Sequence, residues 1–358
     1  MLSNISWYRA VYSLFLAVIF ITFLLLIFRF EVDIGKHFAI LPTMLLGSFV
    51  AGSTPMGGGS VAYPILVHYL DFGSADARTF SLLIQSVGMT SASLFIILYK
   101  REELPWGFIG RTALAGLSGF VLSTFLIYDL VPTTLLKVIY IPFFLSFLII
   151  LLKIQFGNDR KPVYTPPDHP NKSMIPALIA GFSGGVLSGF IGNGIDFMVF
   201  TVMVLYFGFP IKKGTFISII LMTIISLFNS MLLLWDTGAV SERVLASWFL
   251  AANVVLFGAP LGNFVMRLVS DRWVTVFVGL LFSAHVMGVF ASMTLTSSIR
   301  WAMAGCFVIS FTFFYRMYQK YALPITSGKK KRIRLRLRIR LGYRKAAGVL
   351  SFRKGGIL

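Results

Sequence analysis

Two runs of glycine and small polar residues interrupt long apolar stretches of the chain and could bind a ligand. They are Gly57-Gly58-Gly59-Ser60 and Gly192-Asn193-Gly194. Glycine accepts positive φ angles, and because it has no Cβ atom it lets a ligand approach the backbone amides closely. The helices expected to begin near Ser60 and Ile195 would point their N–H groups and positive dipole ends at that ligand. The two runs together therefore predict one site for a small anion, with backbone contacts from the glycines and side-chain contacts from Ser60 and Asn193.

Asp196 follows the second glycine run and is the one acid that we expect deep within the membrane. An ionisable residue is costly there, so it is a functional hypothesis by default. Asp196 could contact the substrate and accept a proton during transport, which would couple transport to a proton gradient. Alternatively, it could accept hydrogen bonds from the free N–H groups at the start of the helix after Gly194. The glycines could also serve only to let helices pack tightly, as small residues often do in membranes.

Three amide side chains within apolar segments, Gln85, Asn229 and Asn253, are further candidates and could line a cavity. Amides in membrane helices also form hydrogen bonds between helices, so that alternative stays open. No metal or cofactor site is predicted, because the single cysteine is Cys306 and the four histidines are scattered. No two acids stand at ligand spacing within a span, and we therefore do not expect an enzyme.

The composition defines the class of protein that must position these residues. Of 358 residues, 57% are hydrophobic and 13% are charged, against about 45–50% and about 25% in soluble domains. This balance excludes a water-soluble domain and a disordered chain, and a single cysteine excludes a disulfide scaffold. The chain is expected to be an all-α polytopic membrane protein.

Apolar runs close to 20 residues long match the thickness of a bilayer and predict full crossings. Eight are expected, at residues 10–30, 79–99, 107–128, 134–153, 214–235, 244–266, 273–292 and 300–322. Two other stretches, 38–72 and 174–208, are too long for one span, and the glycine runs break them. We expect each of these two stretches to fold back as a hairpin.

The two broken stretches are also copies of each other. Aligning their glycine runs at an offset of 135 residues places Ser53 over Ser188 and Phe72-Gly73 over Phe207-Gly208 without a gap. Each copy continues with three spans, which is an odd number of crossings, so the second repeat is expected to be inverted relative to the first. Positively charged loops are expected on the cytoplasmic side, which places both termini in the cytoplasm. We expect the protein in the cytoplasmic (inner) membrane.

The expected organisation is an inverted repeat of a glycine-broken hairpin plus three transmembrane helices, with one extra helix at each end. Its segments are an N-terminal anchor (1–37), a first repeat (38–153), a cytoplasmic linker (154–173), a second repeat (174–292), a C-terminal helix (293–322) and a basic cytoplasmic tail (323–358). Inverted repeats with broken helices are typical of secondary transporters, which hold substrate where the broken elements meet.

The basic tail carries most of the charge imbalance. Twelve of the 32 lysine and arginine residues lie in 329–358, a segment without an acid. A polybasic segment after a transmembrane helix is expected to contact anionic lipid headgroups on the cytoplasmic side, and no nucleic-acid partner is expected. Arginine alternates with apolar residues from Arg334 to Arg340, which predicts a strand or coil at the membrane surface.

The glycine patterns resemble those of a known family. The pattern Gly47-x4-Gly52-x4-Gly57-Gly58-Gly59-x4-Pro64 and its echo Gly181-x2-Gly184-Gly185-x6-Gly192-Asn193-Gly194 are similar to those of the sulfite exporter TauE/SafE permeases, over about residues 38–292. The resemblance implies a permease for sulfite or related sulfur-containing anions in the cytoplasmic membrane. Asn193, in place of the middle glycine, and the added carboxylate of Asp196 depart from the family pattern.

Taken together, the residues predict a secondary transporter that moves a small anion by alternating access. The alternatives are a passive anion channel and a membrane scaffold that transports nothing. No oligomeric state is predicted.

Overall fold

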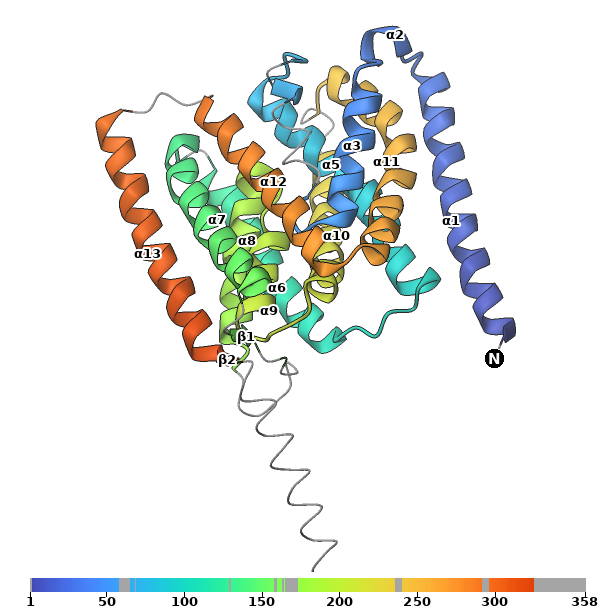
Figure 1. Ribbon diagram of the computed structural model, residues 1–358. Helices are drawn as coiled ribbons and strands as arrows, with labels where there is room; N and C mark the ends of the chain where they lie inside the picture. The colour runs from blue at the N-terminus through green and yellow to red at the C-terminus, as the bar shows by residue number, and fades with distance from the viewer. Residues whose placement is uncertain are drawn as a thin grey trace, which may run out of the picture.

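The computed structural model describes residues 2–57, 65–67, 69–128, 130–157, 160–162, 164, 173–235, 240–291 and 296–324. Helices make up nearly all of this part of the chain (Figure 1), together with one pair of three-residue strands. The protein is therefore an all-α polytopic membrane protein, as its composition predicts.

Each of the eight predicted crossings coincides with a helix. Seven of the described helices are long and apolar enough to cross a membrane: α1 (Leu2–Arg29), α5 (Ser74–Leu94), α6 (Trp106–Leu122), α7 (Thr133–Phe156), α10 (Ile211–Trp235), α11 (Glu242–Leu268) and α13 (Ser297–Tyr321). Short π-helical segments, Phe95–Tyr99 and Ser123–Ile127, extend α5 and α6. The eighth helix, α12 (Asp271–Ala291), overlaps the predicted crossing 273–292 but is not among the seven.

The second glycine-broken stretch folds as a hairpin, as predicted. Its two helices, α8 (Ile175–Ile191) and α9 (Ile195–Leu205), pack against each other across the break at residues 192–194. With 17 and 11 residues, they are about 25 and 16 Å long at 1.5 Å per residue, so neither spans a core about 30 Å thick. The first stretch begins with the similarly short α3 (Ile40–Ser53), and residues 58–64 and 68, which follow α3, lie outside the described residues.

Each of the two broken stretches has a helix that packs on a helix from the other half of the sequence. Helix α3 lies against α11, and α8 lies against α6. Glycines bring the backbones together, since a Cβ atom at Gly52 would collide with the carbonyl oxygen of Ala259, and one at Gly185 with that of Gly116. Gly52 and Gly185 therefore serve close helix packing rather than ligand binding. Each half of the sequence therefore contributes a short helix that packs on a long helix of the other half, as a duplicated chain would. The inverted orientation of the second copy stays a prediction.

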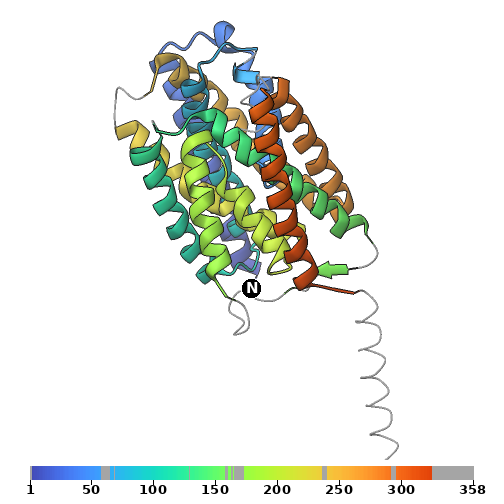
Figure 2. The same ribbon diagram turned by 90° about the vertical axis from the view of Figure 1, so that its left-hand side faces the viewer.

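The first and last long helices lie at opposite sides of the bundle (Figures 1 and 2). Helix α1 packs on α11 and α13 packs on α7. Only 17% of the apolar window of each helix is buried, which suits helices that face lipid.

Local sequence explains several helix ends. The Ser241 hydroxyl accepts a hydrogen bond from the Val244 N–H at 3.4 Å and caps α11. Asp33 caps the single-turn helix α2 (Ile34–His37), where its carboxylate accepts from the Lys36 N–H at 3.2 Å. Gly192 ends α8 in the left-handed conformation, with φ of 82°, which glycine adopts without steric cost.

The predicted linker contacts the chain just beyond α13. Strand β1 (Arg160–Pro162) pairs antiparallel with β2 (Ala322–Pro324), with Lys161 opposite Leu323. The remainder of the basic tail, 325–358, lies outside the described residues, and so does the predicted surface strand or coil.

Candidate functional site

The tips of the two broken stretches touch each other. Gly57 follows α3 with a left-handed φ of 64°, and a Cβ atom there would lie 2.9 Å from Oδ2 of Asp196 and 3.3 Å from Cβ of Asn193. The Asn193 amide Nδ2 donates to the carbonyl oxygen of Met56 at 3.2 Å. Residues 137 positions apart in the sequence therefore form one contact, which we call the tip contact: Met56, Gly57, Asn193 and Asp196.

Asp196 fixes the backbone of the second tip. Only 3% of this residue is exposed. Its Oδ1 atom accepts hydrogen bonds from the N–H groups of Gly194 at 3.1 Å and Phe197 at 2.9 Å. The N–H of Ile195 donates to the Ser188 hydroxyl at 3.1 Å. This is the geometry of the helix-capping alternative, and it leaves these three amides at the start of α9 already occupied.

Gly192 joins the second tip to α5. Its N–H donates to the Ser188 carbonyl oxygen at 3.0 Å, and its own carbonyl oxygen accepts from Nε2 of Gln85 at 3.0 Å. Nε2 also donates to the hydroxyl and carbonyl oxygens of Ser81, both at 2.9 Å. Gln85, predicted as a cavity-lining residue, therefore contacts the second tip directly, and its Oε1 is buried without a hydrogen-bond partner.

The other predicted residues are placed differently. Gly58, Gly59 and Ser60 lie outside the described residues. Asn253 donates to the Phe249 carbonyl oxygen of its own helix at 3.5 Å, and Nδ2 of Asn229 is buried without a partner. Within the described part of the chain, no hydrogen bond links Asn229 or Asn253 to the tip contact.

Arg78 is a residue near the second tip that the sequence analysis missed. Its guanidinium carbon lies 4.2 Å from the centroid of the Tyr128 ring, and its Nε is buried without a hydrogen-bond partner. The expected span began at residue 79 and so excluded it. Arg78 stands seven residues before Gln85, so both lie on one helical face. This spacing could have identified Arg78 from the sequence.

A set of aromatic rings holds α9 against α7 and α12. The Phe197 ring stacks on Phe144 with centroids 3.5 Å apart and meets the Phe282 ring at 5.3 Å. Both Phe197 and Phe282 are almost fully buried. Because Phe197 adjoins Asp196, this packing restrains the carboxylate at the tip contact.

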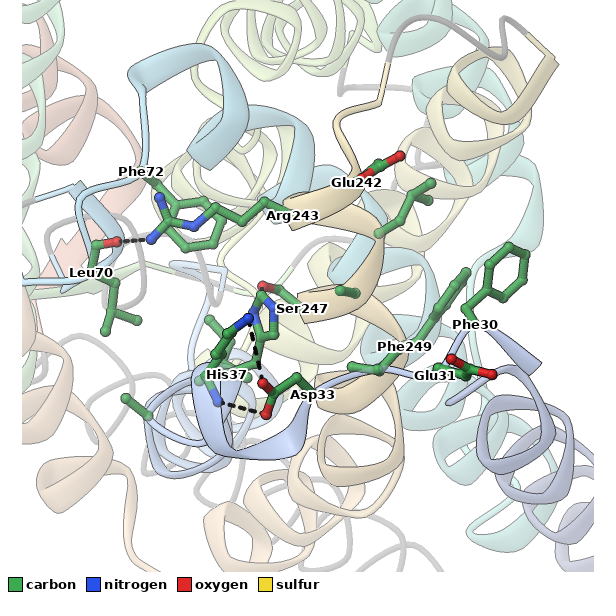
Figure 3. A pocket seen from close by; sticks show the side chains of 16 residues that line it. Phe30, Glu31, Asp33, His37, Leu70, Phe72, Glu242, Arg243, Ser247 and Phe249 are labelled. Carbon is green, nitrogen blue, oxygen red and sulfur yellow. Dashed lines mark hydrogen bonds and ion pairs between the residues drawn. The ribbon is translucent and has the colours of Figure 1, made fainter. Parts of the chain in front are cut away.

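A pocket lies elsewhere, between the α1–α2 connection and the start of α11 (Figure 3). It has a volume of about 790 Å³. Three carboxylates line it, those of Glu31, Asp33 and Glu242, against two permanent cations, those of Lys36 and Arg243. This charge balance does not favour an anion. A smaller space of about 10 Å³ lies beside Gln85, between α3, α5 and α11, with room for about one water molecule.

Several polar groups of this pocket form hydrogen bonds with neighbouring residues. Arg243 donates to the carbonyl oxygens of Leu70 and of Asp71, the latter at 3.0 Å. His37 Nδ1 lies 3.0 Å from the Ser247 hydroxyl. Burial lowers the pKa of His37, and the charge of Arg243 lowers it further. The hydrogen bond from the Lys36 N–H lowers the pKa of Asp33.

Comparison with known proteins identifies one family. The family model described as Sulfite exporter TauE/SafE matches residues 40–291, well over half of the chain. No curated protein sequence matches the chain.

Proposed function

Because the chain belongs to the sulfite exporter TauE/SafE family, we propose that it is a secondary transporter for sulfite or a related organosulfur anion. The family and the long apolar helices make it a multi-pass membrane protein of the permease type. The substrate, the alternating-access mechanism and the location in the cytoplasmic membrane are our proposals.

The observation that carries the proposal is the tip contact. Two broken helical stretches from the two halves of the sequence meet where the non-helical residues Gly57 and Asn193 lie against each other, beside Asp196 in the first turn of α9. Non-helical backbone within a membrane is tolerated only where protein buries it or where it lines a cavity. Secondary transporters place their substrate site at such a meeting point of broken helices.

The closed state of the tip contact supports alternating access over a permanently open pore. Met56, Asn193 and Asp196 are all nearly inaccessible to solvent. A solute would have to separate the two tips, which the hydrogen bond from Asn193 to the Met56 carbonyl oxygen joins. Separation of the tips is therefore the step at which we expect substrate to bind.

We further propose that both termini are cytoplasmic and that the two tips enter from opposite faces. Cysteine-accessibility labelling tests this orientation in a background without Cys306. A cysteine at position 168, in the linker, should react only from the cytoplasmic side. Labelling only from outside would reject the inverted-hairpin topology.

A flux assay in proteoliposomes tests the transport proposal. The reconstituted protein should move sulfite with saturation, and an imposed proton gradient should change the rate if protons are coupled to transport. Flux that grows linearly with concentration and ignores gradients would indicate a channel. Absence of flux for sulfite, thiosulfate and small organosulfonates would support a scaffold.

A further inference from the structure

Three backbone amides at the second tip are already hydrogen-bonded within the tip. The amides of Gly194 and Phe197 donate to the Asp196 carboxylate, and the amide of Ile195 donates to Ser188. An anion near this carboxylate would also be repelled by it. If an anion binds here, a different group must neutralise its charge.

One face of α5 presents three polar residues to this tip. Arg78, Ser81 and Gln85 follow each other at spacings of three and four residues, so they share a helical face. A Cβ atom at Gly192 would lie 3.4 Å from the Arg78 carbonyl oxygen and 3.4 Å from the Ser81 hydroxyl. Gln85 donates to the Gly192 carbonyl oxygen at 3.0 Å. The face of α5 that carries Arg78 is therefore in contact with the tip.

The guanidinium group of Arg78 lies among aromatic rings beside the same tip. It faces the Tyr128 ring at 4.2 Å, and that ring stacks on Phe190 with centroids 5.9 Å apart. Phe190 is two residues before Gly192 in the chain. The Arg78 Nε is buried without a hydrogen-bond partner, and no carboxylate of the described residues forms an ion pair with this arginine.

Arg78 is partly buried and its side chain interacts with Tyr128, and its Nε donor remains available to a counter-ion. Arginine within a membrane protein is normally paired, because an unpaired charge in a low-dielectric environment is costly. The ring of Tyr128 offsets part of that cost through a cation–π interaction. The planar fork of N–H donors fits two oxygen atoms of one anion better than it fits a spherical halide.

We propose that Arg78 binds the transported anion at the second hairpin tip through its guanidinium fork, and that Asp196 positions the tip backbone without contacting the anion. The inference rests on the proposed function and narrows its substrate to small oxyanions. Gln85 donates to the Gly192 carbonyl oxygen on the face of α5 that also carries Arg78, so the tip backbone would form one wall of the site.

The test measures sulfite affinity of the full-length protein in detergent by calorimetry. Removal of a hydrogen-bonded charge should raise the dissociation constant about 10- to 100-fold in Arg78→Gln. Arg78→Lys keeps the charge without the fork, so its affinity should fall between those of the parent and Arg78→Gln. The parent should also bind sulfite more tightly than chloride, and Arg78→Lys should lose part of that preference.

Arg243→Gln is the matched control. Arg243 is also an arginine stacked on an aromatic ring, at 4.3 Å from the Phe72 centroid, but it lies in the pocket between the α1–α2 connection and α11. Its substitution should leave sulfite affinity unchanged. If Arg78→Gln does not fold, parental affinity and selectivity in Arg78→Lys would still overturn the proposal.

Two outcomes separate the inference from the proposed function. Parental sulfite affinity in Arg78→Gln, together with saturable flux, would reject the role of Arg78 and keep the transporter. A parent that neither binds nor transports any of the tested anions would reject both. A carboxylate partner is a competing explanation, and Asp129 follows Tyr128 in the sequence. If Asp129→Asn destabilises the protein as much as Arg78→Gln and neither changes sulfite affinity, the arginine is structural.

Discussion

The tips of the two broken stretches occupy matching positions in the aligned sequence but differ in charge. Residues 54–60 of the first tip contain no acid, whereas Asp196 stands just after the second glycine run. The Oδ1 atom of Asp196 accepts from the amides of its own tip, and its Oδ2 faces Gly57 of the other tip. One carboxylate thus contacts both tips, and the centre where the two stretches meet is asymmetric.

The glycines of the two stretches also divide into two kinds. Gly52 and Gly185 are helical and allow backbones from different helices to pack closely. Gly57 and Gly192 have left-handed backbone conformations at the breaks. Glycine is therefore needed in these stretches for two separate reasons: close packing of helices and the left-handed backbone at the break.

Removal of the shared carboxylate should have the largest effect. Asp196→Ala leaves two buried amides without an acceptor, at about 1–3 kcal/mol each, so the free energy of unfolding should fall by about 2–6 kcal/mol. Asp196→Asn keeps an oxygen acceptor and should lose much less. Denaturant titration in detergent measures both. Equal losses in the two variants would contradict the capping role.

The same pair of variants tests whether Asp196 also takes up protons. If the acid titrates during transport, Asp196→Asn should alter the pH dependence of sulfite flux. An unchanged pH profile would restrict Asp196 to capping the helix. The comparison of the tips would then be one of structure alone.

Substitutions at Gly57 and Gly192, which have left-handed backbone conformations, should cause the next largest loss of stability. A left-handed conformation costs a residue with a Cβ atom about 1–2 kcal/mol, so Gly192→Ala should destabilise by that amount. Gly57→Ala should cost more, because its Cβ atom would lie 2.9 Å from Asp196 Oδ2. In a double-mutant cycle with Asp196→Ala, the extra cost at Gly57 should disappear. Additive effects would argue against the contact between the tips.

The link between the second tip and α5 should have a smaller effect. Gln85→Leu removes the hydrogen bond to Gly192 and should lower stability by about 0.5–1.5 kcal/mol, and it should weaken sulfite binding as the tip loosens. Asn229→Leu is the control, because Asn229 is buried in α10 without a described hydrogen bond to either tip. Equal weakening of binding by both variants would contradict a specific role for Gln85.

The smallest effect is expected at the pocket beside α2, away from the tips. The pKa of His37 is lowered in the folded protein, so below a pH near its ordinary value of about 6.5 the unfolded chain binds more protons than the folded one. The contribution of neutral His37 is therefore complete above that pH and is lost as the pH falls through the lowered folded value. His37→Gln should flatten the fall in melting temperature between about pH 6.5 and 5. This variant also separates the titration of His37 from any titration of Asp196 in flux measurements.

Much of the architecture could be predicted from the sequence because it depends on local properties. The length of apolar runs predicted where helices cross, and the glycine breaks predicted the hairpin of α8 and α9. The position of Asp196 just after Gly194 predicted a possible helix cap, since capping involves residues within a few positions of each other. Asn229 and Asn253 were chosen by the same local argument, and the described contacts do not connect them to the tips.

The sequence by itself determined the class of protein, the helices, the two breaks and the family resemblance. Only the tertiary structure decided that Gly57 meets Asp196, that Gln85 reaches Gly192 and that Arg78 lies beside the second tip. These contacts join residues more than 100 positions apart, and the periodicity of one helix does not specify which face of a distant helix it meets. Packing in a membrane depends on where small residues let backbones approach, so the partners of a polar side chain are defined only once the helices are assembled.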